Sequence, residues 1–175
     1  MRLSLGHLIA IAVSLLGSLI SPAHAAVDMF LKIEGVKGES QDQAHKDEID
    51  VLAWSWQLSK TSAAAPIIRP ISVVKYTDSA SPALISNLLM GTTAPTATLT
   101  VRTVGSIPFE YVVIDLKDVV VTSVSNGGSG TEDRLTEQVY LGFSQVCITY
   151  TPQLADGSAG ASETTCWDVN TNSAP

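Results

Sequence analysis

The sequence predicts a mainly β protein that folds as a closed or nearly closed antiparallel barrel with one helix on its flank. Along most of the chain after residue 26, apolar side chains alternate with polar ones, which is the period of a half-buried strand. Residues 79–90 instead repeat apolar side chains at helical spacing. In addition, the apolar face of a late strand changes side near Ser144 and Gln145, as a β-bulge at a barrel corner would produce.

The first two expected strands flank a charged link. In the first, Met29, Leu31 and Ile33 share a face, and Phe30 is an exception to the alternation. In the second, the large side chains share one face, which we expect to be buried: Leu52, Trp54, Trp56 and Leu58. Further strands are expected at 71–76, 96–103, 110–117, 119–125 and 139–150, with an irregular crossing at 59–70 and a flexible turn at 126–133.

One helix is expected at about residues 79–90. Ser81 can cap its start, Pro82 suits its first turn, and Gly91 ends it. Its apolar residues recur at intervals of three and four, which predicts one stripe packed on the sheet: Leu84, Ile85, Leu88 and Leu89.

Residues 1–25 have the pattern of a cleaved secretory signal. Arg2 precedes an apolar run at 8–20, which is shorter than the roughly 20 residues that span a bilayer. Ala23 and Ala25 give the small-x-small pattern of signal peptidase, so cleavage is expected between Ala25 and Ala26. The mature chain, residues 26–175, is expected to form one domain with no membrane span.

The mature chain is acidic, with 9 basic and 17 acidic side chains and a formal net charge of −8. This balance argues against nucleic acid and anionic membranes as partners.

The two cysteines, Cys147 and Cys166, lie in the exported part, where a disulfide can form. A hairpin that turns at Asp156-Gly157 places them opposite each other, because each lies nine residues from the turn. A register shift of two would leave them diagonal, and unpaired thiols are the alternative.

Catalytic and metal-binding side chains are scarce, so we expect no enzyme activity, no cofactor and no metal site. His45 is the one histidine of the mature chain, and its charged surroundings favour a solvated loop over a metal or acid–base site. Glu132, Asp133 and Glu137 near Arg134 are interpreted as surface charges or a subunit contact rather than a calcium site. Trp54 and Trp56 are expected in the core or an interface rather than in a carbohydrate platform.

Long segments of the chain resemble the Hcp family, the haemolysin-coregulated tube proteins of bacterial type VI secretion. They include DMFLKIEGVKGESQDQAHKDEIDVLAWSW at 28–56, VVKYTDSASPALISNLLMG at 73–91 and GGSGTEDRLTE at 127–137. The resemblance implies a β-barrel with a helix, hexameric rings that stack into a tube, a lumen that can hold effector proteins, and no catalysis. It also implies a ring-stacking loop, formed by Gly38, Glu39, Ser40, Gln41, Asp42, Gln43, Ala44, His45, Lys46, Asp47 and Glu48.

The signal peptide departs from that family, whose tube subunits are assembled in the cytoplasm. We therefore expect an exported, periplasmic or secreted, paralogue that keeps the barrel and ring formation. The alternative is an exported monomeric barrel that serves as a binding module, and sedimentation separates the two.

Overall fold

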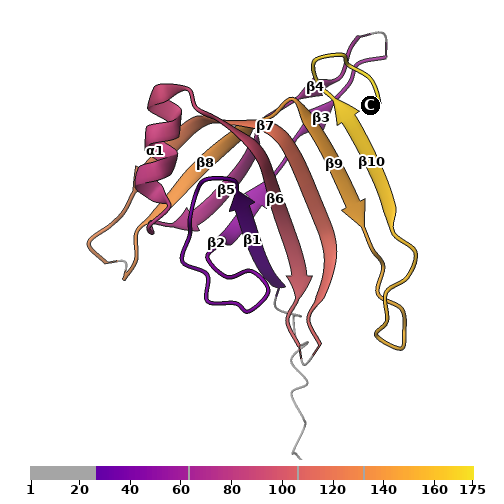
Figure 1. Ribbon diagram of the computed structural model, residues 1–175, viewed down its shortest axis with the longest axis horizontal. Helices are drawn as coiled ribbons and strands as arrows, with labels where there is room; N and C mark the ends of the chain where they lie inside the picture. The colour runs from indigo at the N-terminus through magenta and orange to yellow at the C-terminus, as the bar shows by residue number, and fades with distance from the viewer. Residues whose placement is uncertain (1–26, 63, 106, 132) are drawn as a thin grey trace, which may run out of the picture.

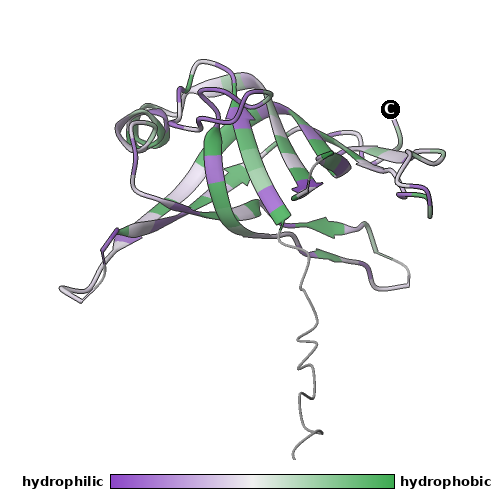
Figure 2. Ribbon diagram, turned by 90° about the horizontal axis from the view of Figure 1, so that it is seen from below, coloured by the Kyte–Doolittle hydropathy of each residue, from purple (hydrophilic) through white to green (hydrophobic). Residues whose placement is uncertain are grey.

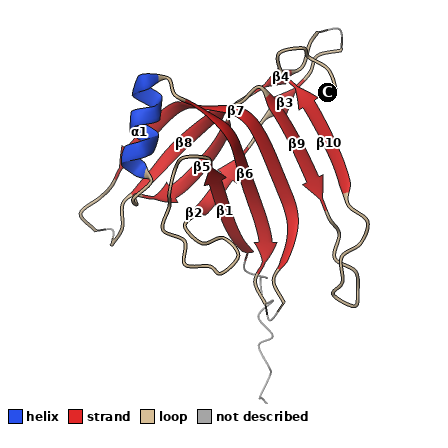
Figure 3. Cartoon of the chain, in the orientation of Figure 1, coloured by secondary structure: helices blue, strands red, loops and turns tan. Residues whose placement is uncertain are grey.

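The structure, a computed structural model, describes residues 27–175 except 63, 106 and 132 (Figures 1 and 3). The expected signal peptide and its cleavage site at Ala25 and Ala26 lie outside the described residues. The elements in chain order are β1 (Val27–Ile33), β2 (Ile49–Ser55), β3 (Leu58–Ser59), β4 (Ile67–Ile68), β5 (Ile71–Tyr76), α1 (Ser81–Met90), β6 (Thr93–Thr103), β7 (Phe109–Gly127), β8 (Thr136–Gly142), β9 (Gln145–Tyr150) and β10 (Glu163–Asp168). None of the helices described is long and apolar enough to cross a bilayer.

Six antiparallel strands close into the predicted barrel, in the order β7-β6-β1-β2-β5-β8. The ring of strands closes because β7 pairs with β6 along one edge and with β8 through its second half. The first half of β7 pairs instead with β9, which pairs with β10. These last two strands therefore extend from the barrel as a separate arm, visible beside β7 in Figure 1.

The change of face predicted near Ser144 and Gln145 is confirmed, and it marks the point where the chain leaves the barrel. β8 ends at Gly142 and β9 begins at Gln145, and both pair with β7 on either side of Asp118. Val139 and Leu141 are buried before the break, as is Val146 after it. Tyr150, which has the same parity as Val146 on this strand, is exposed because it lies on the arm.

The prediction for the second strand is wrong. Ile49 and Val51 are buried, whereas Leu52 is 39% exposed. The pairing of β2 with β5 shifts between Val51 and Ala53, so Leu52 is an extra residue that changes the inward face of the strand. Beyond that bulge, Trp54 and Trp56 are half-buried and pack against the core, as expected for these two residues.

The predicted helix is confirmed as α1, with a correction at its N-terminal end. Ala80 is the N-cap and Ser81 is already helical. Gly91 adopts a left-handed conformation with φ 66°, as expected for a residue that ends a helix. Leu84 is fully buried against the barrel and Leu88 packs on the core, but Leu89 is 79% exposed, so the apolar stripe is narrower than predicted.

A buried ionic cluster joins α1 to the barrel. The Lys75 ammonium donates hydrogen bonds to Asp78 Oδ1 at 2.6 Å and to Glu137 Oε1 at 2.8 Å, and Ser81 Oγ donates to the same Glu137 oxygen at 2.8 Å. The side chains of Lys75 and Glu137 are fully buried. The prediction that Glu137 is a surface charge is therefore wrong, because Lys75 lies directly opposite it across the β5–β8 pair.

Residues 59–70, expected to be irregular, contain a small hairpin of β3 and β4. This hairpin projects on the same side as the β9–β10 arm, and its two short strands are mainly apolar in Figure 2. Between them lies a groove of about 440 Å³ with an apolar lining that includes Trp56, Leu58, Ile68, Ile148 and Trp167.

Candidate assembly site

Residues 38–48, which we call the loop body, are closed on themselves at a narrow neck. The Gly38 N–H donates to the Asp47 carbonyl at 2.8 Å, and the Ser40 N–H donates to the Glu48 carbonyl at 2.9 Å. A Cβ at position 38 would stand 2.2 Å from the Glu48 oxygen, so only glycine fits there. The loop body is therefore a compact unit between β1 and β2.

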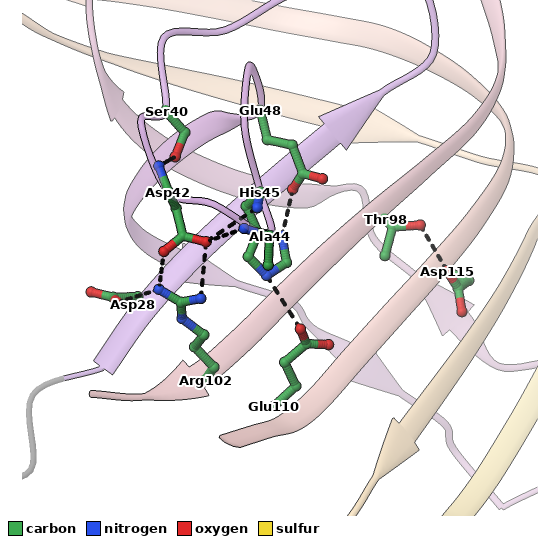
Figure 4. Close-up of polar contacts among 10 residues, drawn as sticks. All are labelled: Asp28, Ser40, Asp42, Ala44, His45, Glu48, Thr98, Arg102, Glu110 and Asp115. Carbon is green, nitrogen blue, oxygen red and sulfur yellow. Dashed lines mark hydrogen bonds and ion pairs between the residues drawn. The ribbon is translucent and has the colours of Figure 1, made fainter. Parts of the chain in front are cut away.

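The loop body lies on the outer face of the barrel, where it meets a row of three charged residues. Asp28 on β1 is opposite Arg102 on β6, and Arg102 is opposite Glu110 on β7. Phe30, two residues after Asp28, lies beside this row. We call Asp28, Phe30, Arg102 and Glu110 the cradle, and Figure 4 shows its three charged members.

Arg102 is the main anchor between loop and cradle. Its Nη1 donates to Asp42 Oδ1 at 3.0 Å, and its Nη2 donates to the other Asp42 oxygen and to Asp28 Oδ2. The guanidinium also lies 4.8 Å from the centre of the Phe30 ring. Arg102 is only 8% exposed, which is tolerable for a charge because both carboxylates pair with it.

The same contacts change the acidity of the partners. The Arg102 hydrogen bond lowers the pKa of Asp42 from its ordinary 3.8 to about 2, assisted by the N–H groups of Ala44 and His45. The Asp42 carboxylate in turn raises the pKa of Arg102. Both groups are therefore fully charged at neutral pH, and the docking of the loop is ionic.

His45 supplies the second contact, and its position corrects the expectation of a solvated loop. It is 7% exposed, and its ring stacks on Phe30 with 4.1 Å between the ring centres and 8° between the planes. Nδ1 lies 2.9 Å from Glu48 Oε2 and Nε2 lies 3.3 Å from Glu110 Oε1. The side chain is thus held between the loop and the cradle (Figure 4).

A third contact ties the loop to the segment before α1. Glu39 Oε1 accepts a hydrogen bond from the Ser79 N–H at 2.9 Å. The loop residues named from the sequence are therefore brought together, but their cradle partners were not predicted. Phe30 gave the available signal, because a large apolar residue that breaks the alternation of a strand requires a cover on the outer face.

The arrangement is suited to binding between protein surfaces. Within residues 27–175, apart from the three positions left undescribed, no group of three His, Cys, Asp or Glu side chains is placed to hold a metal ion. Of the acidic cluster expected near Arg134, Glu132 lies outside the described residues and Glu137 is buried. Arg134 itself stacks over the Tyr76 ring, 4.0 Å from its centre.

The cysteine register predicted from the sequence is confirmed. Cys147 on β9 is directly opposite Cys166 on β10, and the two form a disulfide. Trp167, the residue after Cys166, packs against the core, as the predicted parity requires. The bond therefore fastens β10, the last strand in the order of the sheet, to its neighbour β9.

Comparison with known proteins identifies the family. The model of the family described as "Type VI secretion system effector, Hcp" matches residues 30–150, which include the loop body, α1, the cradle except Asp28, and all six barrel strands except the first three residues of β1. The chain belongs to the Hcp family. Protein hcp1 of Pseudomonas aeruginosa is 46% identical over 158 residues, which cover 84% of this chain and 98% of that protein.

Solved structures agree with the assignment to the Hcp family. Hcp1 from Salmonella typhimurium is 35% identical, with a TM-score of 0.76 over 86% of this chain and 99% of its own. A type VI secretion system effector from Yersinia pestis is 32% identical, with a TM-score of 0.70 over 81% of this chain and 100% of its own. The predicted barrel with one flanking helix is therefore an Hcp fold.

Proposed function

We propose that this chain is a structural, non-catalytic tube subunit of a type VI secretion system, or an exported paralogue of one, and that it assembles into hexameric rings. The observation that carries the proposal is similarity over nearly the full length of two Hcp1 proteins, 98% of one and 99% of the other. Subunits of this kind act by assembly, and the lumen of their stacked rings can hold effector proteins.

The loop body is the proposed contact between stacked rings. It is a unit closed at its own neck on the outer face of the barrel, and most of its side chains are polar or charged. Replacing residues 41–46 with a short glycine turn should abolish stacking and leave the rings intact. Electron microscopy of the two proteins at equal concentration checks this, and filaments of unchanged length would contradict the role of the loop.

In a ring of six subunits, each lateral contact joins two different surfaces, one from each neighbouring subunit, because cyclic rings use heterologous interfaces. The apolar groove between the β3–β4 hairpin and the β9–β10 arm has the character of such a contact. It combines half-buried tryptophans with Leu58, which is exposed.

Sedimentation of the oxidised chain from Ala26 to Pro175 tests ring formation. The tube-subunit proposal expects a species with six times the mass of the monomer. A monomer at all concentrations would contradict it and would favour the exported binding module instead.

We also infer that residues 1–25 export the protein. The family match begins at residue 30, and the alignment with P. aeruginosa hcp1 leaves about a sixth of this chain unmatched. In a Gram-negative host, the periplasmic protein should have the mass of residues 26–175. Ala25→Arg should block cleavage, whereas Ala26→Ser should not. A periplasmic product that keeps residues 1–25 would contradict the cleavage site.

A further inference from the structure

We propose that the cradle receives the loop body of a second copy of this chain, so that adjacent rings stack by exchanging loops. The inference rests on the proposed stacking role of residues 38–48 and names the surface that the loop binds. In the structure, the loop occupies the cradle of its own barrel, and this contact is the template for the contact between copies.

Charge complementarity identifies the occupant of the cradle. The loop presents Asp42 and His45, and the cradle presents Arg102 and Glu110 to them in matching positions (Figure 4). Both contacts are made by side chains, and among the described residues the backbone–backbone hydrogen bonds of the loop body stay within the loop. The loop can therefore leave the cradle without breaking a strand pair.

Exchange costs little because the same contacts are made in both arrangements. A loop that leaves its own cradle loses the Arg102–Asp42 pair, the stacking of His45 on Phe30 and the Ser79–Glu39 hydrogen bond, and it regains the same contacts on the neighbouring barrel. The neck keeps the loop body together during this movement. Gly35, with φ 82° and open space around it, lies where β1 joins the loop and can act as a hinge.

Two charge-reversed variants separate exchange from docking within one subunit. The first carries Asp42→Arg, which gives a cationic loop and the natural cradle. The second carries Arg102→Asp, which gives the natural loop and an anionic cradle. Within either variant, the loop and the cradle have charges of the same sign and repel each other. In a mixture, the cationic loop of the first variant fits the anionic cradle of the second, and the natural loop of the second fits the natural cradle of the first.

The expected result is that each variant alone stacks roughly tenfold less than the unaltered chain, and that an equimolar mixture of preformed rings recovers stacking. Filament length in electron micrographs and the sedimenting mass give the readout. A mixture that stacks no better than either variant would overturn exchange, as would undiminished stacking of either variant alone.

Three controls keep the outcome interpretable. Each variant must first form rings, which shows that its barrel is folded, and a chain carrying both substitutions should stack by itself. If Arg102→Asp prevents folding, His45→Glu, which sets a carboxylate against Glu110, should weaken stacking instead. Mixing those rings with Glu110→Lys rings, altered at a cradle position that is half-exposed, should restore it. Unaltered rings that never stack would refute the proposed stacking role itself, before any variant is compared.

Discussion

Two cationic residues of this chain, Lys75 and Arg102, are buried in different parts of the molecule. Lys75 lies inside the molecule with Glu137 and Asp78, where it joins the helix to the barrel. Arg102 lies on the outer face, where Asp28, Phe30 and the loop cover it. Removing Lys75 is therefore expected to affect folding, whereas removing Arg102 is expected to affect the loop.

Lys75→Met should destabilise the protein by about 3–5 kcal/mol, because Glu137 and Asp78 would be left as buried carboxylates without their partner. Urea unfolding of the oxidised protein measures this. The matched control is Lys37→Met, since Lys37 is 74% exposed and forms a surface pair with Asp47. That substitution should cost less than about 1 kcal/mol, and an equal loss in both variants would contradict the buried role of Lys75.

Acid should release the loop through Asp42. Its pKa is about 2 when docked and 3.8 ordinarily, so its contribution is complete above pH 3.8 and is lost as the pH falls toward 2. Hydrogen exchange of the Ala44 and His45 amides, which donate to Asp42, should accelerate in this range after correction for intrinsic rates. His45, Glu48, Asp28 and Glu110 face the same site, so Asp42→Asn is the control that isolates Asp42. If the variant keeps the full pH dependence in this window, Asp42 is not the titrating group.

At the scale of elements, the β9–β10 arm and the loop body both lie outside the closed ring of six barrel strands. Within the arm, the Cys147–Cys166 bond fastens β10 to β9, which itself pairs with β7, and the loop is fastened by its neck and the cradle. Each can therefore be loosened while the six barrel strands stay paired.

Replacing both cysteines with serine should free β10 while the barrel persists. A disulfide that closes a loop of this length contributes on the order of 3 kcal/mol in the chain-entropy model. Amides of residues 163–168 should then exchange faster, whereas those of β1 and β6 should not change. The oxidised parent is the control, and unchanged protection of β10 would show that its hydrogen bonds to β9 suffice.

Gly38→Ala should open the neck of the loop, because a Cβ there would stand 2.2 Å from the Glu48 oxygen. Stacking should weaken while ring formation is preserved. Gly105→Ala is the matched control, since a Cβ at that position has no neighbour within 4 Å. Electron microscopy of both variants compares filament length, and equal filaments would mean that the neck tolerates the change.

At the scale of the whole molecule, the six barrel strands form a closed sheet, so none of these six strands lies at a free edge that could pair with another subunit. We therefore expect assembly to use the loop body and the groove outside the barrel. The loop lies on one part of the outer face, and the β3–β4 hairpin and the β9–β10 arm, which line the groove, lie on another part (Figure 1). This separation allows stacking and ring formation to be disrupted independently.

Leu58→Asp should dissociate the hexamer into monomers, because it places a charge in the proposed apolar contact. The barrel should stay folded, since Leu58 is exposed on the small hairpin. Leu89→Asp is the control, as Leu89 is an exposed leucine on α1 outside the groove. Sedimentation velocity measures both, and intact rings of the Leu58 variant would exclude the groove from the ring contact.

Local patterns in the sequence determined where most of the barrel strands lie, the helix with Gly91 at its end, and the opposed positions of Cys147 and Cys166, but they missed the β3–β4 hairpin and the continuity of β7. Alternation, helical spacing and hairpin register are short-range, so they can be deduced from neighbouring residues. Only the tertiary structure decided that Lys75 meets Glu137, that Leu52 bulges outward and that Arg102 receives the loop. Those outcomes depend on the register between strands distant in the chain, since a shift of one residue moves a side chain to the opposite face.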